Sequence, residues 1–462
     1  MLKFPLLSLL SLSLLGCATG LFNSAGQDDS ATGQSAVEIS RTLKLRPGHL
    51  VIIQGVTSQN ESFLNILVPR LKNYIYTVTD PDGQNVVVVK YESIQYAPVF
   101  YKVDKLRVKG LRPGPSYKLQ VIDQSAKRRT LIDERSFSSL DLAKPRARFA
   151  VASGLSDEWR FDTVIDPMWA RLAREKPDFV VLNGDVVHVD SHDFVERRRA
   201  SEQDLWQRYI DTFQRVPFYH QSRLVPVLAT WDDLDYGTNN ADREFLAKDA
   251  ARRVFNAFFG APDLPGVYET GAGGTYAVFT GFNQRFLLMD NRSHRLPKSL
   301  KENEPFAHWG ETQHRWLLAA LASRPLPSWV FNGDQFFNGK DHTDKESFEG
   351  DHPKHFKRLM DDLKMLKTPV VFVSGDAQFS EVMKIPAERG PGFPTYELTS
   401  SSMHAKAREP WANPLRVPGA QTGEFNFLLV TSENFEGRLR ADARALGLSG
   451  QDYFRVNLEV KR

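Results

Sequence analysis

Short runs of β-branched and aromatic residues, separated by turn residues, fill the first part of the chain from about residue 37 to 143. The clearest of these runs are 51–53, 63–68, 74–78, 86–89 and 99–108. The Pro-Asp-Gly sequence at 81–83 is a turn signal, because proline fixes φ, aspartate bonds to nearby backbone and glycine accepts a positive φ. The pattern predicts a β-sandwich domain over residues 37–143.

One segment of this region resembles fibronectin type III-like domains. Leu-Arg-Pro-Gly-Pro-Ser-Tyr at 111–117 is followed by a strand pattern with alternating Leu119 and Val121. The resemblance implies that Tyr117 packs at a corner of the sandwich. Such domains mostly space or dock other domains, so we expect no chemistry here.

Beyond Lys144 and Pro145 the pattern changes to strands that alternate with helices. This alternation of strands and helices predicts a layered α/β domain over residues 144–462. We expect strands at 147–153, 178–182, 223–230 and 368–374, and helices at 167–176, 243–259 and 312–321.

The N-terminal residues have a different pattern, which is typical of a segment that is removed from the mature protein. Lys3 precedes an apolar stretch at 6–15, and Gly16 and Cys17 follow it. This order is typical of a secretory signal, and the stretch is too short to span a bilayer. Residues 1–16 resemble a bacterial lipoprotein signal peptide, which implies cleavage before Cys17 and lipidation of that residue. The alternative is a plain secretory signal with an incidental cysteine.

The small and polar residues at 17–36 predict a flexible tether between the lipidated cysteine and the folded part. The lipoprotein resemblance implies an exported protein, held at the bacterial cell envelope by lipid. Ala18 resembles the residue found in lipoproteins sorted to the outer membrane, so we expect that membrane rather than the inner one.

Composition narrows the function classes. The chain has 462 residues, with 59 Lys plus Arg against 56 Asp plus Glu and a single cysteine. The formal charge of +3 argues against a nucleic-acid scaffold, which must neutralise many phosphates. A single cysteine excludes both an intramolecular disulfide and a cysteine-rich metal site.

Three predicted strands each lead into aspartate. Asp185 follows the strand at 178–182, Asp232 and Asp233 follow the strand at 223–230, and Asp376 follows the strand at 368–374. Ligands in open α/β sheets collect beyond the carboxyl ends of the strands. Several carboxylates in one crevice repel one another unless a cation lies among them. The alternative is that each aspartate caps a helix or turn.

Five ordered motifs resemble those of the alkaline phosphatase D family, within the calcineurin-like metallophosphoesterases. They are Asn-Gly-Asp-Val-Val-His at 183–188, Trp-Asp-Asp-Leu-Asp-Tyr-Gly-Thr-Asn-Asn at 231–240, Leu-Met-Asp-Asn-Arg at 288–292, Gly-Glu-Thr-Gln-His-Arg-Trp-Leu at 310–317 and Val-Ser-Gly-Asp-Ala-Gln-Phe-Ser-Glu at 373–381. The resemblance covers roughly residues 147–405. It implies an α/β/β/α sheet-on-sheet sandwich behind the β-sandwich domain, with a metal centre that hydrolyses phosphate mono- or diesters.

The resemblance also implies roles for single residues. Asp185 would bridge metals, Asn239 and Asp376 would be ligands, and Asp233 would lie at the centre as a ligand and catalytic group. Two cations about 3.5–4 Å apart polarise phosphoryl oxygens and activate a water for in-line attack. Oxygen ligands suit Ca²⁺, Mg²⁺ or Mn²⁺. Arg292 is a catalytic candidate as a phosphate clamp, with an ordinary surface arginine as the alternative.

Four positions depart from the family pattern. Gly154 replaces the usual cysteine, His188 the usual tyrosine, Leu234 the usual histidine after Trp-Asp-Asp, and Gln378 the histidine of Gly-Asp-x-His. Loss of the cysteine ligand makes iron less favoured than Ca²⁺, Mg²⁺ or Mn²⁺. His188 can serve as a ligand through its imidazole.

Replacement ligands can come from elsewhere in the chain. His404 and Asp334 are candidates, and the segment up to Phe356 is dense in ligand types: Asp341, His342, Asp344, Glu346, Asp351, His352 and His355. The alternative for this segment is a polar surface loop.

Two functions therefore stay open. The first is an exported, lipid-anchored metal-dependent phosphatase or phosphodiesterase, with a phosphate ester as its substrate and the membrane as its partner. The second is a catalytically inactive relative with a binding or structural role in the envelope, since a fold does not guarantee a function.

Overall fold

A computed structural model describes residues 49–125, 129–191, 200–297, 300, 304–339, 346–366 and 368–461. The predicted signal peptide, Cys17 and the tether lie outside the described residues. Within the described part of the chain, no helix has the length and the apolar character needed to cross a bilayer.

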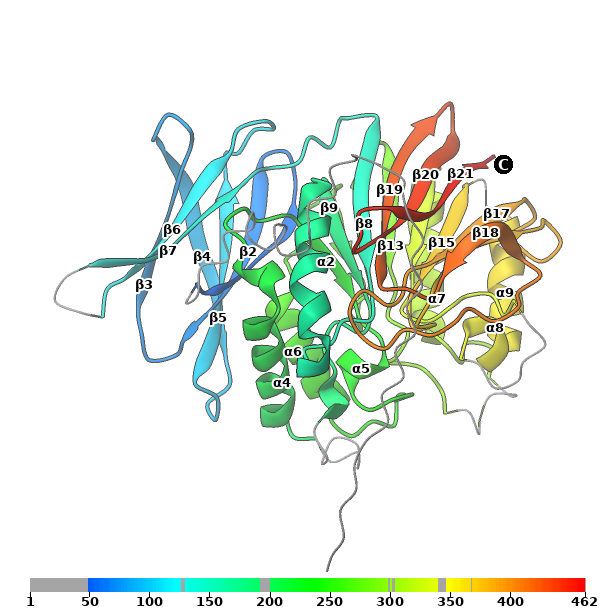
Figure 1. Cartoon of the computed structure of the whole chain (residues 1–462), viewed down its shortest axis with the longest axis horizontal. Coiled ribbons are helices and arrows are strands. Elements are labelled where there is room, and N and C mark those ends of the chain that lie inside the picture. The colour runs from blue at the N-terminus through cyan, green and yellow to red at the C-terminus, as the bar shows by residue number, and fades with distance from the viewer. Residues whose placement is uncertain are drawn as a thin grey trace, which may run out of the picture. The chain divides into compact units, whose positions relative to one another are not determined.

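The first seven strands form one sheet in the order β1-β2-β5-β4-β3-β6-β7 (Figure 1). Their bounds are β1 Val51–Thr57, β2 Glu61–Pro69, β3 Tyr74–Thr79, β4 Asn85–Gln95, β5 Tyr101–Lys109, β6 Tyr117–Asp123 and β7 Thr130–Phe137. Apolar residues of β1, β2 and β5 share one core with those of β3, β6 and β7, so the two halves of the sheet pack against each other. The Tyr117 hydroxyl accepts a hydrogen bond from the Arg112 backbone N–H at 2.9 Å.

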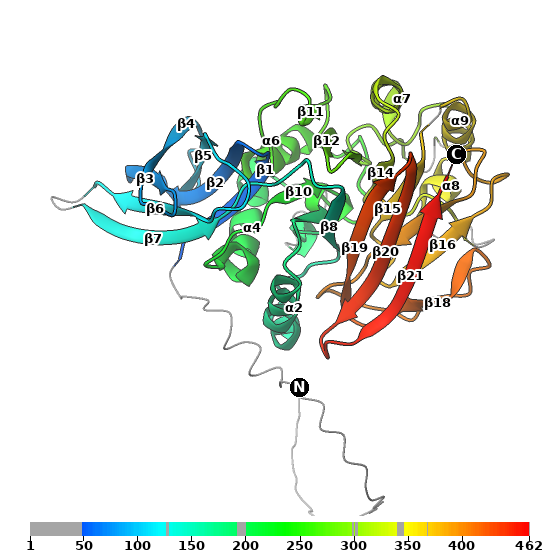
Figure 2. The ribbon, with the colours of Figure 1, turned by 90° about the horizontal axis from the view of Figure 1, so that it is seen from above.

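The remaining strands form two further sheets. The six-stranded sheet has the order β10-β9-β8-β19-β20-β21, in which β8, β9 and β10 are parallel. Figure 2 shows β19, β20 and β21 side by side. The bounds are β8 Arg146–Ala152, β9 Phe179–Asn183, β10 Val227–Thr230, β19 Asn426–Phe435, β20 Arg438–Gly447 and β21 Asp452–Val460.

The eight-stranded sheet has the order β11-β12-β13-β14-β15-β17-β16-β18. Strands β13, β14, β15 and β17 are parallel. The bounds are β11 Tyr268–Thr270, β12 Ala277–Gly281, β13 Gln284–Leu288, β14 Ser328–Phe331, β15 Val370–Ser374, β16 Ser380–Ile385, β17 Thr395–Thr399 and β18 Arg416–Thr422.

Helices cover these two sheets. The α-helices are α2 Asp162–Arg174, α4 Glu202–Arg215, α5 Asp233–Tyr236, α6 Lys248–Phe258, α7 Gly310–Ser323, α8 Phe348–Asp351 and α9 Pro353–Lys364, and the 3₁₀ helices are η1 Trp159–Phe161, η2 Val189–Ser191 and η3 Pro217–His220. Helices α2, α4 and α6 pack on β8, β9 and β10, and α7 and α9 pack on β13, β14 and β15.

The two larger sheets pack against each other through aromatic residues. The Phe149 ring of β8 lies 5.4 Å from that of Phe286 on β13 and 5.2 Å from that of Trp329 on β14, both edge-on. Aromatic pairs in this geometry add to the free energy gained by burial. The chain is therefore a mixed α/β protein rich in sheet, as the sequence predicts.

Two predicted helix starts are wrong by five residues. The helix expected from residue 243 begins at Lys248. The sequence places the start of the other, α2, at Pro167. The helix begins at Asp162 instead, and Pro167 lies inside it. Val164 and Ile165 are buried in the added turn, so tertiary packing extends the helix ahead of the proline.

Candidate metal centre

The carboxyl ends of the parallel strands from both sheets meet at one place. The Asn183 amide, at the end of β9, donates to the Asn332 carbonyl beyond β14 at 3.1 Å. The Gly375 N–H, beyond β15, donates to the Gly333 carbonyl at 2.8 Å. A Cβ added at Gly375 would lie 2.7 Å from the Asn183 carbonyl oxygen, so only glycine permits this approach of the two sheets.

Three aspartates converge at this junction. Ligand oxygens of Asp185, Asp232 and Asp233 all lie within 4.8 Å of one another, and all three side chains are buried. Asp185 and Asp376 adopt left-handed backbone conformations, with φ of 53° and 57°. Such strain in non-glycine residues is typical of functional sites. The predicted convergence of Asp185 and Asp233 is therefore seen, and Asp232 joins them.

Asp235 holds this arrangement together. Its Oδ1 accepts the N–H groups of Val186 and Val187, each at 2.8 Å, and its Oδ2 accepts the Asp232 N–H at 2.9 Å. It thus ties the loop after β9 to the loop after β10. Burial raises the pKa of Asp235 to about 7, although these backbone hydrogen bonds act to lower it. Asp235 is not among the residues expected at the site from the sequence, but its place three residues after Asp232 at a helix start is a capping signal.

The carboxylates of this cluster lie close to one another without enough positive charge nearby to balance them. Burial raises the pKa of Asp185 well above its usual value, and Asp233, Asp232 and Asp376 raise it further. Burial also raises the pKa of Asp376, helped by Glu346, Asp232 and Asp233. These effects place Asp376 in the same field as the three converging aspartates. A bound cation would relieve the repulsion.

Arg292 lies on one side of this cluster and is completely buried. Its Nε donates to Asp232 Oδ1 at 2.6 Å, and its Nη1 pairs with Glu346 Oε1 at 2.8 Å. The surface-arginine interpretation is wrong, because the two carboxylates hold the guanidinium in the interior. Its nitrogens contact protein carboxylates, so we revise its role from phosphate clamp to ion-pair partner of Asp232 and Glu346.

A second buried arginine extends the network. Arg295 pairs with Asp334 at 2.7 Å, Asp351 at 2.8 Å and Glu346 at 2.9 Å. Burial acts to raise the pKa of Asp334, but Arg295 and His308 outweigh it and keep this pKa well below its usual value. Asp334 is therefore an ion-pair partner of Arg295, and the sequence analysis had no signal that distinguished this role from that of a ligand.

His188 and Asn239 lie at the edges of the cluster. The His188 Nε2 atom is buried and has no hydrogen-bond partner among the described residues. Burial lowers the pKa of His188, which favours the neutral ring that binds metals. Asn239 is exposed, and its side-chain amide lies beside that of Asn240. The Asn240 N–H in turn donates to Asp233 Oδ2 at 2.6 Å, so Asn239 is one residue removed from the aspartates.

The position of the family's cysteine is closed to any side chain. Gly154 has a φ of +65°, and a Cβ there would lie 2.8 Å from Ser402 Oγ. His404 is not available as a replacement ligand. Its Nε2 accepts from Trp169 Nε1 at 2.9 Å, and its Nδ1 lies 3.0 Å from the Ser156 carbonyl. Burial lowers the pKa of His404 to about 4, so the ring is neutral and committed to these contacts.

The described part of the ligand-rich segment includes helix α8 and the start of helix α9. Asp341, His342 and Asp344 lie outside the described residues, whereas Asp351, His352 and His355 are buried. The surface-loop interpretation is therefore wrong for this described part. His355 Nε2 lies 3.0 Å from His314 Nδ1, and His314 Nε2 lies 2.8 Å from Asp362 Oδ2. These contacts fix α9 against α7, and His355 accordingly has a structural role.

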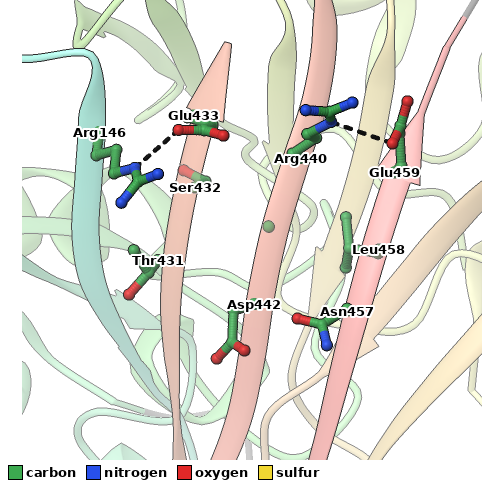
Figure 3. A pocket seen from close by; sticks show the side chains of 10 residues that line it. Arg146, Thr431, Ser432, Glu433, Arg440, Asp442, Asn457, Leu458 and Glu459 are labelled. Atoms are coloured by element: carbon green, nitrogen blue, oxygen red, sulfur yellow. Dashed lines mark hydrogen bonds and ion pairs between the residues drawn. The ribbon is translucent and has the colours of Figure 1, made fainter. Parts of the chain in front are cut away.

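A hollow of about 400 Å³ lies elsewhere, on strands β8, β19, β20 and β21 (Figure 3). Ion pairs line it, including Arg146 with Glu433 at 2.7 Å and Arg440 with Glu459 at 3.1 Å. Arg146 begins β8, whereas the aspartates follow the carboxyl ends of the strands parallel to it. The hollow is thus at the opposite end of the sheet from the metal centre.

No protein-family profile matches the sequence, and no curated protein matches it. Among solved structures, one described as "Structure of PhoD" matches with a TM-score of 0.65 and 17% identity, over 89% of this chain and 88% of that chain. An amylomaltase from Corynebacterium glutamicum matches over 39% of this chain and 31% of that chain, with 13% identity, and its TM-score of 0.16 is too low to support a shared fold. The chain therefore has a PhoD-like fold.

Proposed function

We propose that this protein is a metal-dependent hydrolase of phosphate mono- or diesters. The observation that carries the proposal is the junction of Asp185, Asp232 and Asp233, with Asp376 in the same field, at the strand ends of a PhoD-like fold. The expected layers, α/β/β/α behind a fibronectin III-like domain at 37–143, belong to the same proposal.

The donor atoms fit a divalent cation. Asp185 Oδ1 and Asp232 Oδ2 are buried without a hydrogen-bond partner among the described residues, as is His188 Nε2. A buried polar atom without a partner is costly in free energy, so the two aspartate oxygens at this junction indicate a ligand. Oxygen donors suit Mg²⁺, Mn²⁺ or Ca²⁺, and the closed space at Gly154 makes an iron site with a cysteine ligand untenable here.

In this mechanism Asp185, Asp232 and Asp233 would hold the cation, with Asp376 and His188 as further ligands. Asp235 fixes the loops of the first three, since it binds backbone N–H groups beside Asp185 and at Asp232. When bound, the cation polarises the phosphoryl oxygens and lowers the pKa of a water that attacks the phosphorus. No side-chain nucleophile is needed.

The proposal is tested by hydrolysis of chromogenic phosphate mono- and diesters by the purified full chain with Mg²⁺, Mn²⁺ or Ca²⁺. We expect Asp185→Ala and Asp376→Ala to lower kcat/KM about 100-fold or more, because loss of even an outer-shell partner costs roughly 10–100-fold. Asp442→Ala is the matched control, because this aspartate lines the distant hollow of Figure 3. Turnover equal in wild type and both variants would refute the proposal.

One observation favours the second function, an inactive binding protein. Gln378 replaces the family's histidine, and its Oε1 accepts from Arg408 Nη2 at 2.6 Å and from Nε at 3.0 Å. This amide oxygen is therefore already engaged, and Leu234 has no polar atom to offer. Metal binding without turnover of any ester in the same assay would favour this function.

We also propose export and lipid anchoring through Cys17, with the outer membrane as the destination. The support is the charged, apolar and small-residue order of residues 1–17. Palmitate labelling and cell fractionation test the proposal. Wild type should take up label and sediment with outer membranes, whereas Cys17→Ser should take up none. Labelling of Cys17→Ser, or an unlabelled wild type, would contradict it.

A further inference from the structure

We propose that the centre binds one divalent cation per chain, and that the Arg292 guanidinium supplies the second positive charge. This inference rests on the proposed function, because both require a cation at Asp185, Asp232 and Asp233. It differs from the two-cation arrangement that the sequence analysis expects.

The two carboxylate oxygens of Asp232 have different surroundings, one suited to the Arg292 guanidinium and the other to a metal ion. Its Oδ1 accepts hydrogen bonds from Arg292 Nε at 2.6 Å and Asn291 Nδ2 at 2.7 Å, and Arg292 Nη2 lies 2.5 Å away in the ion pair. Three nitrogen atoms therefore surround this oxygen. Its Oδ2 is buried and has no hydrogen-bond partner among the described residues. One oxygen therefore serves the arginine, and the other is left for a metal ion.

The carboxylates beyond Arg292 are occupied in the same way. Glu346 Oε1 lies 2.8 Å from Arg292 Nη1 and 2.9 Å from Arg295 Nη2. Asp334 accepts from Arg295 at 2.7 Å and from Asn291 at 2.9 Å. On this side of Asp232 the oxygens that a second metal ion would need are in contact with guanidinium and amide nitrogens.

The carboxylates on the other side differ in that no arginine among the described residues pairs with them: Asp233 accepts only the backbone N–H groups of Leu234 at 2.9 Å and Asn240 at 2.6 Å. Across the part of the chain that the structure describes, Asp185, Asp233 and Asp376 make no ion pair with Lys, Arg or His, whereas Asp232, Glu346, Asp334 and Asp351 do. The carboxylates are thus divided into a group that pairs with Arg292 and Arg295 and a group that pairs with neither. The second group is left to hold one divalent cation.

Arg292 cannot give way to a metal ion. Its guanidinium stays protonated at any physiological pH and has no acceptor atom. The side chain is completely buried, so it has no path to solvent that leaves the packing intact. A second divalent ion at Asp232 Oδ1 or Glu346 would lie against this fixed positive charge. Arg292 is therefore a positioning residue that acts through Asp232.

The stoichiometry of Mn²⁺ in the full chain tests the inference. Equilibrium dialysis with elemental analysis should give one Mn²⁺ per chain, and the electron paramagnetic resonance spectrum should be that of an isolated ion. Two Mn²⁺ per chain with an exchange-coupled spectrum would overturn the inference and leave the proposed function standing. No bound Mn²⁺ would refute the proposed function as well.

Variants of Arg292 give an independent readout. Arg292→Met removes the charge at similar length, so the stoichiometry should rise from one to two, whereas Arg292→Lys keeps the charge and should stay at one. Arg135→Met is the matched control, because Arg135 is buried and pairs with Asp133 at 2.6 Å outside the centre. It should bind one ion. One ion in folded Arg292→Met, or two in Arg292→Lys, would overturn the inference.

Discussion

The backbone conformation and the surroundings of Gly154 both require a residue without a side chain. The residue lies directly after β8, and its backbone has a φ of +65°. Ser401 Oγ and Ser402 Oγ would lie 3.2 Å and 2.8 Å from an added Cβ. The two serines therefore fill the space in which the family's cysteine would project. A cysteine could not be restored here without moving the loop that follows β17.

Gly154→Ala should lower the free energy of unfolding by about 2 kcal/mol. The left-handed backbone accounts for roughly 1 kcal/mol, and the contact with Ser402 adds strain of similar size. Gly419→Ala is the control, because Gly419 has a φ of +77° with nothing within 4 Å of an added Cβ. Urea unfolding measures both variants. Equal losses would show that Ser402 does not close this space.

Sequence reasoning predicts some residues of the centre and not others. Asp185, Asp233 and Asp376 follow from a general rule, because each comes directly after a buried strand. The role of Arg292 does not follow, since it depends on Glu346, which is remote in the chain and meets it only in the folded state. Asp232 shows the limit most clearly. Its Oδ1 accepts from Arg292 whereas its Oδ2 has no hydrogen-bond partner among the described residues, and nothing in the sequence distinguishes the two oxygens.

At the level of elements, the parallel strands determine where the aspartates of the proposed site lie. Strands β8, β9 and β10 belong to one sheet, and β13, β14, β15 and β17 to the other. Hydrophobic patterns predict β8, β9 and β15 closely and β10 in its second half. Hydrophobic patterns do not show that the carboxyl ends of the parallel strands of the two sheets lie together. This depends on contacts between distant segments, such as the hydrogen bond from Asn183 to Asn332.

A hydrogen bond between distant segments also joins the seven-stranded sheet to the α/β part of the chain. Lys105 of β5 is buried, and its Nζ donates to the Asn256 carbonyl in the last turn of α6 at 2.7 Å. A cation is favourable at the C-terminal end of a helix. Burial nevertheless lowers the pKa of Lys105 to about 8.

This lowered pKa predicts a pH-dependent stability difference between wild type and Lys105→Met. From pH 8 to about 10.5 the folded state has released the Lys105 proton and the unfolded state retains it. Wild type should therefore gain stability over the variant as pH rises through this range, by about 3 kcal/mol at most. Below pH 8 the difference should be constant. Denaturant unfolding at each pH measures it, and a gain confined to acidic pH would contradict the assignment.

For the whole molecule, the proposed metal centre couples buried charge to the free energy of unfolding. Asp185, Asp233 and Asp376 are buried or half-buried together and make no ion pair among the described residues. Their mutual repulsion must be offset by the rest of the fold when no cation is bound. Cation binding should relieve this repulsion, and the protein should then be more stable.

Asp185→Asn should accordingly have opposite effects with and without metal. In chelator, the variant should melt at a higher temperature than wild type, because one buried negative charge is removed. A divalent cation at 100 times its Kd should stabilise wild type by about 2.7 kcal/mol and the variant by much less. Thermal unfolding shows both effects, and Asp442→Asn should respond as wild type does. Equal metal-induced shifts in all three proteins would exclude Asp185 as a ligand.

Anomalous scattering from crystals of the protein grown with Mn²⁺ locates the bound cation without reference to activity. We expect one peak per chain, within ligand distance of Asp185, Asp232 and Asp233 and on the side of Asp232 away from Arg292. Bound Mn²⁺ found only elsewhere in the chain, with no peak among these three aspartates, would contradict this expectation.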